Sequence, residues 1–184
     1  VVPGSTLDHV VFFCNDGSAY TLPSDQLPVS SGDGEPLAKR AKMKDGVSVV
    51  GALTTDARFV TTLDEVGDEV GLTLLIATKA GQVMRLPFEA FRTPSTKSGR
   101  KFCRLGKTDQ VAYVDLVRDA ETMFMASKKA RILHFAIEDV PVLGNAGKGV
   151  RGIKLEAGDE LLGVVQLSRP SDALRVRNDN DSIL

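Results

Sequence analysis

The stretch LTLLIATKAGQVMRLP, residues 72–87, is followed after a loop by GRKFCRLGKTDQVAYVDLV, residues 99–117. Each part holds two apolar runs of strand length around a tight turn, at Lys79-Ala80-Gly81 and at Gly106 to Asp109. Short runs rich in β-branched and aromatic residues, bounded by turn residues, are typical of antiparallel strands. The stretch therefore predicts four short strands and hardly any helix.

The same pattern occurs twice more along the chain. The first copy reads VVFFCNDGSAYTLP (10–23) and PLAKRAKMKDGVSVVGAL (36–53), and the last reads TMFMASKKARILHF (122–135) and GKGVRGIKLEAGDELLGVVQL (147–167). Because Asp45, Asp109 and Asp159 fall at matching places, the copies are 64 and 50 residues apart. Periods near 50 residues built from short strands are typical of propeller blades. We therefore expect an all-β, propeller-like single domain over residues 1–184, with four strands in each copy.

The expected blades cover about residues 5–55, 72–118 and 121–168. The hairpin turns of the first two contain glycine, whereas the third, Ser127 to Ala130, does not, so its turn type is open. Residues 56–71 do not fit the repeat and predict a strand or two with an acidic loop. Residues 169–184 are either the start of a fourth, partial copy or a loosely held terminus.

Composition excludes several classes of protein. With 184 residues and 42% hydrophobic content, the chain can bury a core. Its 23 basic and 24 acidic side chains give no overall attraction to a polyanion, so any such site has to be local. Cys14 and Cys103 are too few for a disulfide framework, and no run resembles a signal peptide or membrane span. We expect a cytoplasmic protein without a membrane partner, with both thiols buried as small hydrophobes.

The third strand of each copy carries a recurring pattern of a basic residue, two further residues, a second basic residue and an apolar residue. It reads Lys39 to Met43, Lys101 to Leu105 and Arg151 to Leu155. Because side chains alternate across a strand, Ile153 and Leu155 face one side and Lys154 faces the other. We also expect the glycines at 147 and 149 to let a ligand approach the backbone closely. The candidate DNA-binding residues are Lys39, Arg40, Lys42, Lys97, Arg100, Lys101, Arg104, Lys148, Arg151 and Lys154.

A single basic cluster is usually a solvated face, but three at equivalent blade positions favour a basic rim that contacts phosphates without reading bases. Aromatic residues make up 5% of the chain and Trp is absent, which disfavours single-strand binding by base stacking. Double-stranded DNA is therefore the predicted partner. The alternative is a protein-interaction scaffold without DNA binding, for which Phe88 and Phe91 are the best candidates, although Pro87-Phe88 more often caps a blade core.

The repeated pattern, above all GKGVRGIKL at 147–155 followed by Gly158-Asp159, resembles the C-terminal domain of the A subunit of bacterial type IIA topoisomerases, DNA gyrase and topoisomerase IV. The resemblance covers all three copies. It implies a β-pinwheel that binds and bends duplex DNA on its outer rim, in association with the nucleoid. It also implies two protein partners, the catalytic domains of the topoisomerase A subunit and the separate ATPase subunit. The gyrase-specific box has only a partial match at 144–149, so gyrase and topoisomerase IV both remain open.

No residue is predicted to be catalytic, and no metal or cofactor is expected. His9 and His134 lie in apolar runs without a Cys or His at metal-ligand spacing, and Tyr20 and Tyr113 lie within strand patterns. No Walker loop, nucleophile elbow or dinucleotide fingerprint occurs. By the family resemblance, the DNA-cleaving tyrosine belongs to a domain outside this chain.

Overall fold

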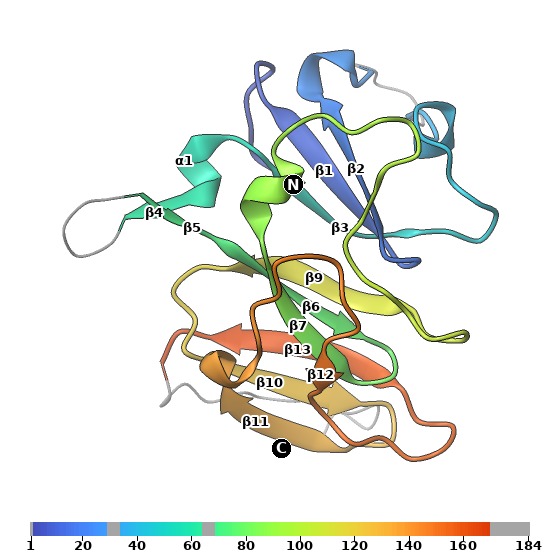
Figure 1. Ribbon diagram of the computed structural model, residues 1–184, viewed down its shortest axis with the longest axis vertical. Coiled ribbons are helices and arrows are strands. Elements are labelled where there is room, and N and C mark those ends of the chain that lie inside the picture. Colours follow the sequence, from blue (N-terminus) through green and yellow to red (C-terminus); the bar gives the residue numbers. More distant parts are fainter. Residues whose placement is uncertain (1, 29–33, 64–68, 170–184) are drawn as a thin grey trace.

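The computed structural model describes residues 2–28, 34–63 and 69–169. Three antiparallel sheets follow one another along the chain and lie from top to bottom in Figure 1. In each sheet the first strand of a hairpin pairs on its other side with the closing strand of the same copy. These strands are β1 (His9–Cys14), β2 (Ser18–Pro23) and β3 (Val49–Thr54); β6 (Thr73–Thr78), β7 (Gln82–Pro87) and β9 (Val111–Val117); β10 (Thr122–Ser127), β11 (Ile132–Ala136) and β13 (Leu161–Leu167).

The third strand of the second and third copies leaves its own copy and completes the preceding sheet. β8 (Arg100–Lys101) pairs with β2, and β12 (Val150–Arg151) pairs with β7. The first two sheets thereby have four strands, in the orders β3-β1-β2-β8 and β12-β7-β6-β9. The all-β, pinwheel-like fold is confirmed, but the fourth strand of each of the first two blades comes from the next copy and not, as we expected, from the same one.

Glycine in the hairpin turns makes this strand exchange possible. Gly17 and Gly81 adopt positive φ values of 77° and 81°. A Cβ on Gly17 would lie 2.3 Å from the Cys103 carbonyl oxygen, and one on Gly81 would lie 2.7 Å from the Ile153 carbonyl oxygen. The incoming strand therefore packs directly against the turn backbone, where only glycine leaves room.

A phenylalanine cluster forms the core between the first two blades. Phe13 comes from β1, Phe91 from the 3₁₀ turn η3 (Phe88–Phe91), and Phe102 directly follows β8. Their rings meet edge to face, with centroids 5.5 Å apart for Phe13 and Phe91 and 5.2 Å apart for Phe13 and Phe102. This geometry favours aromatic pairs beyond the area that they bury. The exchanged strand thus brings its own anchor into the neighbouring core.

A second core lies between the second and third blades and is built mainly from aliphatic side chains. Leu75, Met123, Met125 and Val140 are fully buried there. The short turn η4 (Ile137–Asp139) contributes Ile137, just as η3 contributes Phe88 to the first core. Closing strands of successive blades also pack together, β3 on β9 and β9 on β13. These three strands form the inner side of the array, and β8 and β12 form its outer side.

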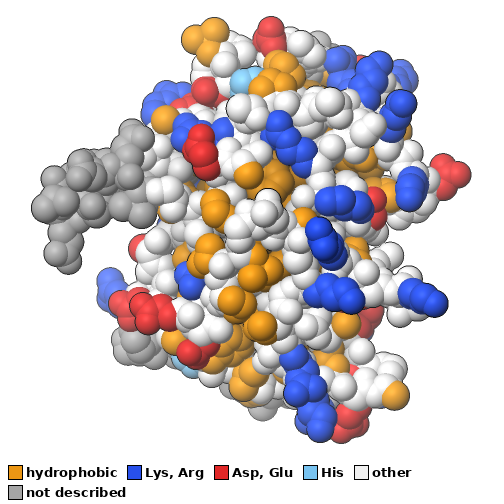
Figure 2. Space-filling view, in the orientation of Figure 1, with side chains coloured by type: hydrophobic (Ala, Val, Ile, Leu, Met, Phe, Trp, Pro, Cys, Tyr) orange, Lys and Arg blue, Asp and Glu red, His pale blue; other side chains and the backbone are white. Residues whose placement is uncertain are grey.

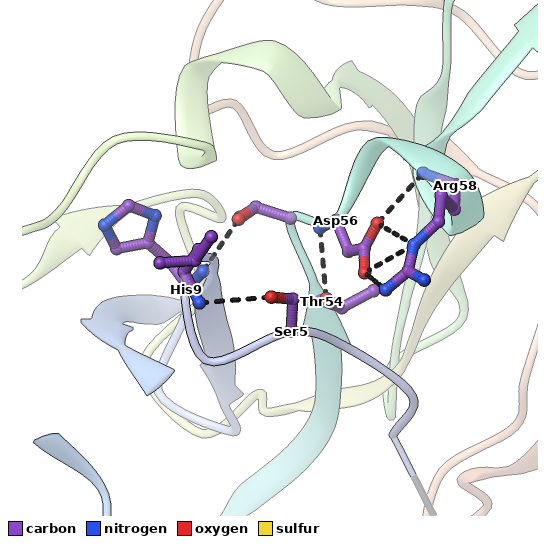
Figure 3. A network of polar contacts seen from close by, with 7 residues as sticks. Ser5, His9, Thr54, Asp56 and Arg58 are labelled. Carbon is purple, nitrogen blue, oxygen red and sulfur yellow. Dashed lines mark hydrogen bonds and ion pairs between the residues drawn. The ribbon is translucent and has the colours of Figure 1, made fainter. Parts of the chain in front are cut away.

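The acidic insertion is more ordered at its start than the sequence indicates. The predicted strands are present as β4 (Thr61–Leu63) and β5 (Glu69–Gly71), but they are preceded by a helical turn, α1 (Ala57–Val60). Asp56 caps this turn and accepts hydrogen bonds from the Arg58 amide and guanidinium (Figure 3). The Arg58 hydrogen bonds lower the pKa of the Asp56 carboxyl. The expected acidic loop at residues 64–68 lies outside the described residues.

The third strand of the first copy is not a strand. Residues 37–39 form a 3₁₀ turn, η2 (Leu37–Lys39), and the following residues run as a loop. Ala41 is buried against Cys14 and Tyr20 of its own blade. Another short turn, η1 (Ser24–Gln26), follows β2. Within the described residues no earlier blade offers this segment an edge to pair with, which explains the difference from the other two copies.

Candidate nucleic-acid interface

The predicted basic positions lie on three segments that join end to end. We call them the rim segments: residues 37–44, 97–104 and 148–154. The amide of Lys42 donates to the Lys97 carbonyl over 2.7 Å, and the amide of Arg104 donates to the Gly147 carbonyl over 2.8 Å. Each bond links the second cation of one copy to the loop that precedes the first cation of the next. The rim segments therefore form one continuous band, to which all three copies of the repeat contribute.

Positive side chains gather along this band. Figure 2 shows a column of Lys and Arg side chains along the right-hand edge of the molecule. In Figure 1 the light-blue, yellow-green and orange loops that carry the rim segments reach the same edge. A protein of net charge −1 thus presents one locally basic edge.

The expected alternation of side chains is present in each rim segment. Ala41, Cys103 and Ile153 are buried, with exposed fractions of 4%, 1% and 4%. The residue after each, Lys42, Arg104 or Lys154, is exposed. The apolar member anchors the segment in a blade core, and its neighbour therefore points its charge to solvent.

Seven of the ten predicted cations are exposed and make no ion pair with any described residue. They are Lys39, Lys42, Lys97, Arg104, Lys148, Arg151 and Lys154. Many cations elsewhere are already paired with carboxylates: Arg58 with Asp56, Lys79 and Lys128 with Glu160, Arg92 with Glu89, and Arg131 with Glu156. The unpaired positive charge is therefore concentrated on the rim segments.

The other three predicted cations are engaged within the protein. Arg40 pairs with Glu35 at 3.2 Å. Lys101 donates to the Asp16 carbonyl over 2.7 Å and lies 3.6 Å from the Asp16 carboxylate. The Arg100 guanidinium donates to four oxygens of the loop at residues 90–94. Arg100 therefore holds the loop that leads into the second rim segment, and its charge is less available to a ligand.

Two cavities recur at equivalent junctions between blades. One of about 390 Å³ lies between β2 and residues 94–97, with Lys39, Arg40 and Lys97 in its lining. The second, of about 220 Å³, lies between the end of β7 and residues 144–146, with Arg100 and Lys101 in its lining. Each cavity places cations beside a short polar loop, an arrangement that suits an anionic group.

The glycine-rich loop of the third copy has a different role from the one we expected. A Cβ on Gly149 would lie 2.3 Å from the Val83 carbonyl oxygen. Gly147 contributes the carbonyl that accepts from Arg104. Gly149 thus allows β12 to approach β7 closely, and the space that we assigned to a ligand at this glycine is occupied by the neighbouring strand.

Aspartates of the closing turns are structural. Asp109 accepts from the Ala80 amide over 2.9 Å, and Asp159 accepts from the Lys129 amide over 3.0 Å and from the Ser127 hydroxyl over 2.6 Å. Burial raises the pKa of Asp159, but its hydrogen bonds outweigh that effect, so its pKa is lowered overall. Each carboxylate ties a closing turn to the hairpin turn of the same copy. This explains the aspartate at the closing turns of the second and third copies.

The two cysteines and two tyrosines pack within the fold. Burial raises the pKa of the Cys14 thiol to about 11 and that of Cys103 to about 12, as expected for thiols that pack as hydrophobes. Burial also raises the pKa of Tyr113, whose hydroxyl accepts from Gln166 over 3.1 Å. The Tyr20 hydroxyl donates to the Lys42 carbonyl over 3.2 Å and so supports a rim segment. Among the described helices, none is long and apolar enough to cross a membrane.

Comparison with known proteins identifies the family of this fold. The chain matches the family described as "DNA gyrase C-terminal domain, beta-propeller" over residues 8–56, 73–118 and 121–168. The chain belongs to this family. It is 28% identical to the A subunit of DNA gyrase from Chlamydia muridarum over 98% of its length, and 29% identical to that from Staphylococcus aureus over 87%. It covers 21% and 17% of those two proteins, so it spans about a fifth of the gyrase A subunits that it resembles.

Solved structures show the same fold. The C-terminal domain of DNA topoisomerase IV aligns over 91% of this chain and 50% of its own, with a TM-score of 0.77 and 19% identity. The E. coli ParC C-terminal domain aligns over 89% of this chain and 64% of its own, with a TM-score of 0.71 and 23% identity. A gyrase A C-terminal domain gives 0.63, with 21% identity over 89% of this chain and 49% of its own. This gyrase-family domain thus shares its blade architecture with both classes of enzyme.

In this gyrase-family domain the aromatic surface considered for protein binding is not exposed. Phe88 and Phe91 are 2% and 4% exposed and belong to the core between the first two blades. One structural feature was not predicted from the sequence. The carbonyls of Gly17 and Gly81 accept hydrogen bonds from the second and third rim segments and so position them. The glycines in the first two hairpin turns were visible, but nothing in the sequence alone showed which strand would reach them.

Proposed function

We propose that this domain binds double-stranded DNA through phosphate contacts along the rim segments, independently of base sequence and without catalysis of its own. The proposal rests on a single observation. Main-chain hydrogen bonds join the rim segments, which carry seven exposed, unpaired cations, into one band. Unpaired Lys and Arg neutralise phosphates and release counterions, which provides affinity but no sequence preference. The two junction cavities provide further seats for phosphates along that band.

We infer further that the duplex bends around the outer edge, since the cations lie on successive blades. Bending 20 to 30 base pairs costs on the order of 1–6 kcal/mol, which several phosphate contacts can supply. The domain is then expected to speed the ligase-mediated circularisation of short duplexes. Binding with unchanged circularisation would reduce its role to that of a clamp.

In the whole protein, the domain would position or wrap the DNA segment for the catalytic domains of a topoisomerase A subunit, which work together with an ATPase subunit. The named relatives, of which this chain spans about a fifth, support this inference. The setting is then the bacterial nucleoid. The role can be tested with a chimera in which this domain replaces the C-terminal domain of a relative's A subunit. The measurement is DNA supercoiling or relaxation by that chimera.

Removing two rim charges tests DNA binding itself. The double variant Arg151→Gln, Lys154→Gln deletes two exposed, unpaired cations. With a slope of about 0.9 per phosphate contact, the loss of two contacts lowers affinity by about 50-fold at 0.1 M salt and the salt slope by about 2. Mobility shift of one duplex across a range of salt concentrations measures both quantities.

A matched control removes the same net charge elsewhere. Lys79→Gln with Lys128→Gln deletes two cations that lie outside the rim segments and pair with Glu160. We expect this control to bind within about threefold of the parent, since only long-range attraction changes. Equal losses in the two double variants would show that binding follows total charge and that the rim has no special role.

A further inference from the structure

Among the described residues, no strand equivalent to β8 or β12 lies on the outer edge of the third sheet. Among the described residues β11 pairs only with β10, and the sheet order is β11-β10-β13. At the position that accepts the incoming strand, Ala19 of β2 is 1% exposed and Val83 of β7 is 2% exposed. The equivalent residue on β11, Ile132, is 65% exposed. An apolar position that is buried in two blades is therefore open in the third.

The three hairpin turns next to these edges have the same geometry. The amides of Gly17, Gly81 and Ala130 each donate to the carbonyl three residues earlier, over 3.0, 2.9 and 3.1 Å. All three residues have positive φ, of 77°, 81° and 59°. Ala130 is the only described non-glycine residue with positive φ. The third copy thus keeps a left-handed turn conformation that normally requires glycine. Alanine is less stable than glycine in this conformation.

The methyl group of Ala130 stands where an incoming strand would place its backbone. In the first two blades a Cβ at this turn position would lie 2.3 Å or 2.7 Å from a carbonyl oxygen of the exchanged segment, closer than side-chain carbons approach. Because the turns are equivalent, the real Cβ of Ala130 points at the same site on the third blade. A strand that docks there in the manner of β8 or β12 would collide with it.

We propose that Ala130 ends the strand exchange, so that the β11 edge does not accept a third-strand segment in the way that β2 and β7 do. A charged residue beside Ala130 also disfavours strand pairing at this edge. The first residue after the turn is Ser18 or Gln82 in the accepting blades but Arg131 in the third, where it pairs with Glu156 of its own blade. Charged side chains on exposed edge strands are a common protection against unwanted pairing. The proposal concerns the assembly of blades and does not depend on DNA binding.

The test is a substitution that reopens the edge. Ala130→Gly removes the methyl group and suits the left-handed turn, so the variant is expected to fold at least as well as the parent. The probe is a fluorescent peptide with the sequence of residues 146–157, which contains the natural β12 segment. We expect the peptide to bind Ala130→Gly at least tenfold more tightly than the parent, and to protect the amide of Ile132 from hydrogen exchange. Equal binding to both proteins, or no binding to either, would overturn the proposal.

The reciprocal substitution is an internal control. Gly81→Ala places a methyl group at the equivalent turn of the second blade, 2.7 Å from the Ile153 carbonyl oxygen. We expect the amides of residues 150–153 to lose protection from hydrogen exchange by at least tenfold, while those of β10 and β13 keep theirs. If β12 stays protected in this variant, a methyl group at the turn does not exclude a strand, and the role assigned to Ala130 is wrong.

Discussion

Replacement of Gly17 by alanine is expected to lower the free energy of unfolding by about 2–4 kcal/mol. An alanine at a φ of 77° costs about 1 kcal/mol compared with glycine. Its Cβ would also lie 2.3 Å from the Cys103 carbonyl oxygen and 3.3 Å from the Cys103 side chain. Overpacking of this kind typically costs a further 1–3 kcal/mol. Denaturant unfolding measures the loss, which corresponds to a fall in melting temperature of roughly 5–15 °C.

Gly46 provides the matched control. Its φ is also 77°, but a Cβ there would meet no atom within 4 Å. Gly46→Ala therefore carries the conformational cost alone, about 1 kcal/mol. The difference between the two variants isolates the contact with the exchanged strand. Similar losses for both would mean that the close approach of Cys103 to the first hairpin turn contributes nothing to stability.

Raising the salt concentration fourfold, from about 50 to about 200 mM, is expected to weaken duplex binding by roughly three decades. The estimate assigns two phosphates to each of the three rim segments, and each contact contributes about 0.9 to the slope of log affinity against log salt. The seven unpaired cations of the rim segments are enough to supply that number of contacts. Fluorescence anisotropy with duplexes of unrelated sequence should give the same slope.

Base-specific binding would behave differently. Hydrogen bonds to base edges change affinity between sequences by about 1–3 kcal/mol per contact and depend less on salt. A slope near 1, or affinities that differ more than tenfold between duplexes of equal length, would therefore contradict the phosphate-contact account.

Much of the fold could be predicted because each element has a local cause. The alternation of apolar residues around Asn15-Asp16-Gly17 and Lys79-Ala80-Gly81 fixes two hairpins, and the repeat of this pattern fixes the blades. The burial of Ile153 and the exposure of Lys154 agree with the predicted alternation, although both residues lie just beyond the short strand β12. The strand exchange could not be predicted in this way. A segment such as Arg100–Lys101 has the same local pattern whether it pairs within its copy or with the preceding one.

The sequence indicated which positions are basic, but not which of these cations are engaged within the protein. Arg100 begins the exchanged strand β8, and Arg151 ends the exchanged strand β12. The two arginines therefore look alike in the sequence. The structure separates them because residues 90–94 present four oxygens to Arg100, whereas no described residue forms an ion pair with Arg151. Such differences depend on loops whose path is set by tertiary packing.

The most direct test of the continuous rim is an NMR titration of the isotope-labelled chain with a duplex of about 20 base pairs, the length at which bending becomes measurable. Lys42, Arg104 and Lys154 come from three different copies of the repeat, and their amide signals are expected to shift together, with one apparent affinity. The amides of Lys79 and Lys128, which pair with Glu160, are expected to stay unchanged. Shifts confined to a single rim segment, or centred on the hairpin turns that carry Lys79 and Lys128, would contradict the account.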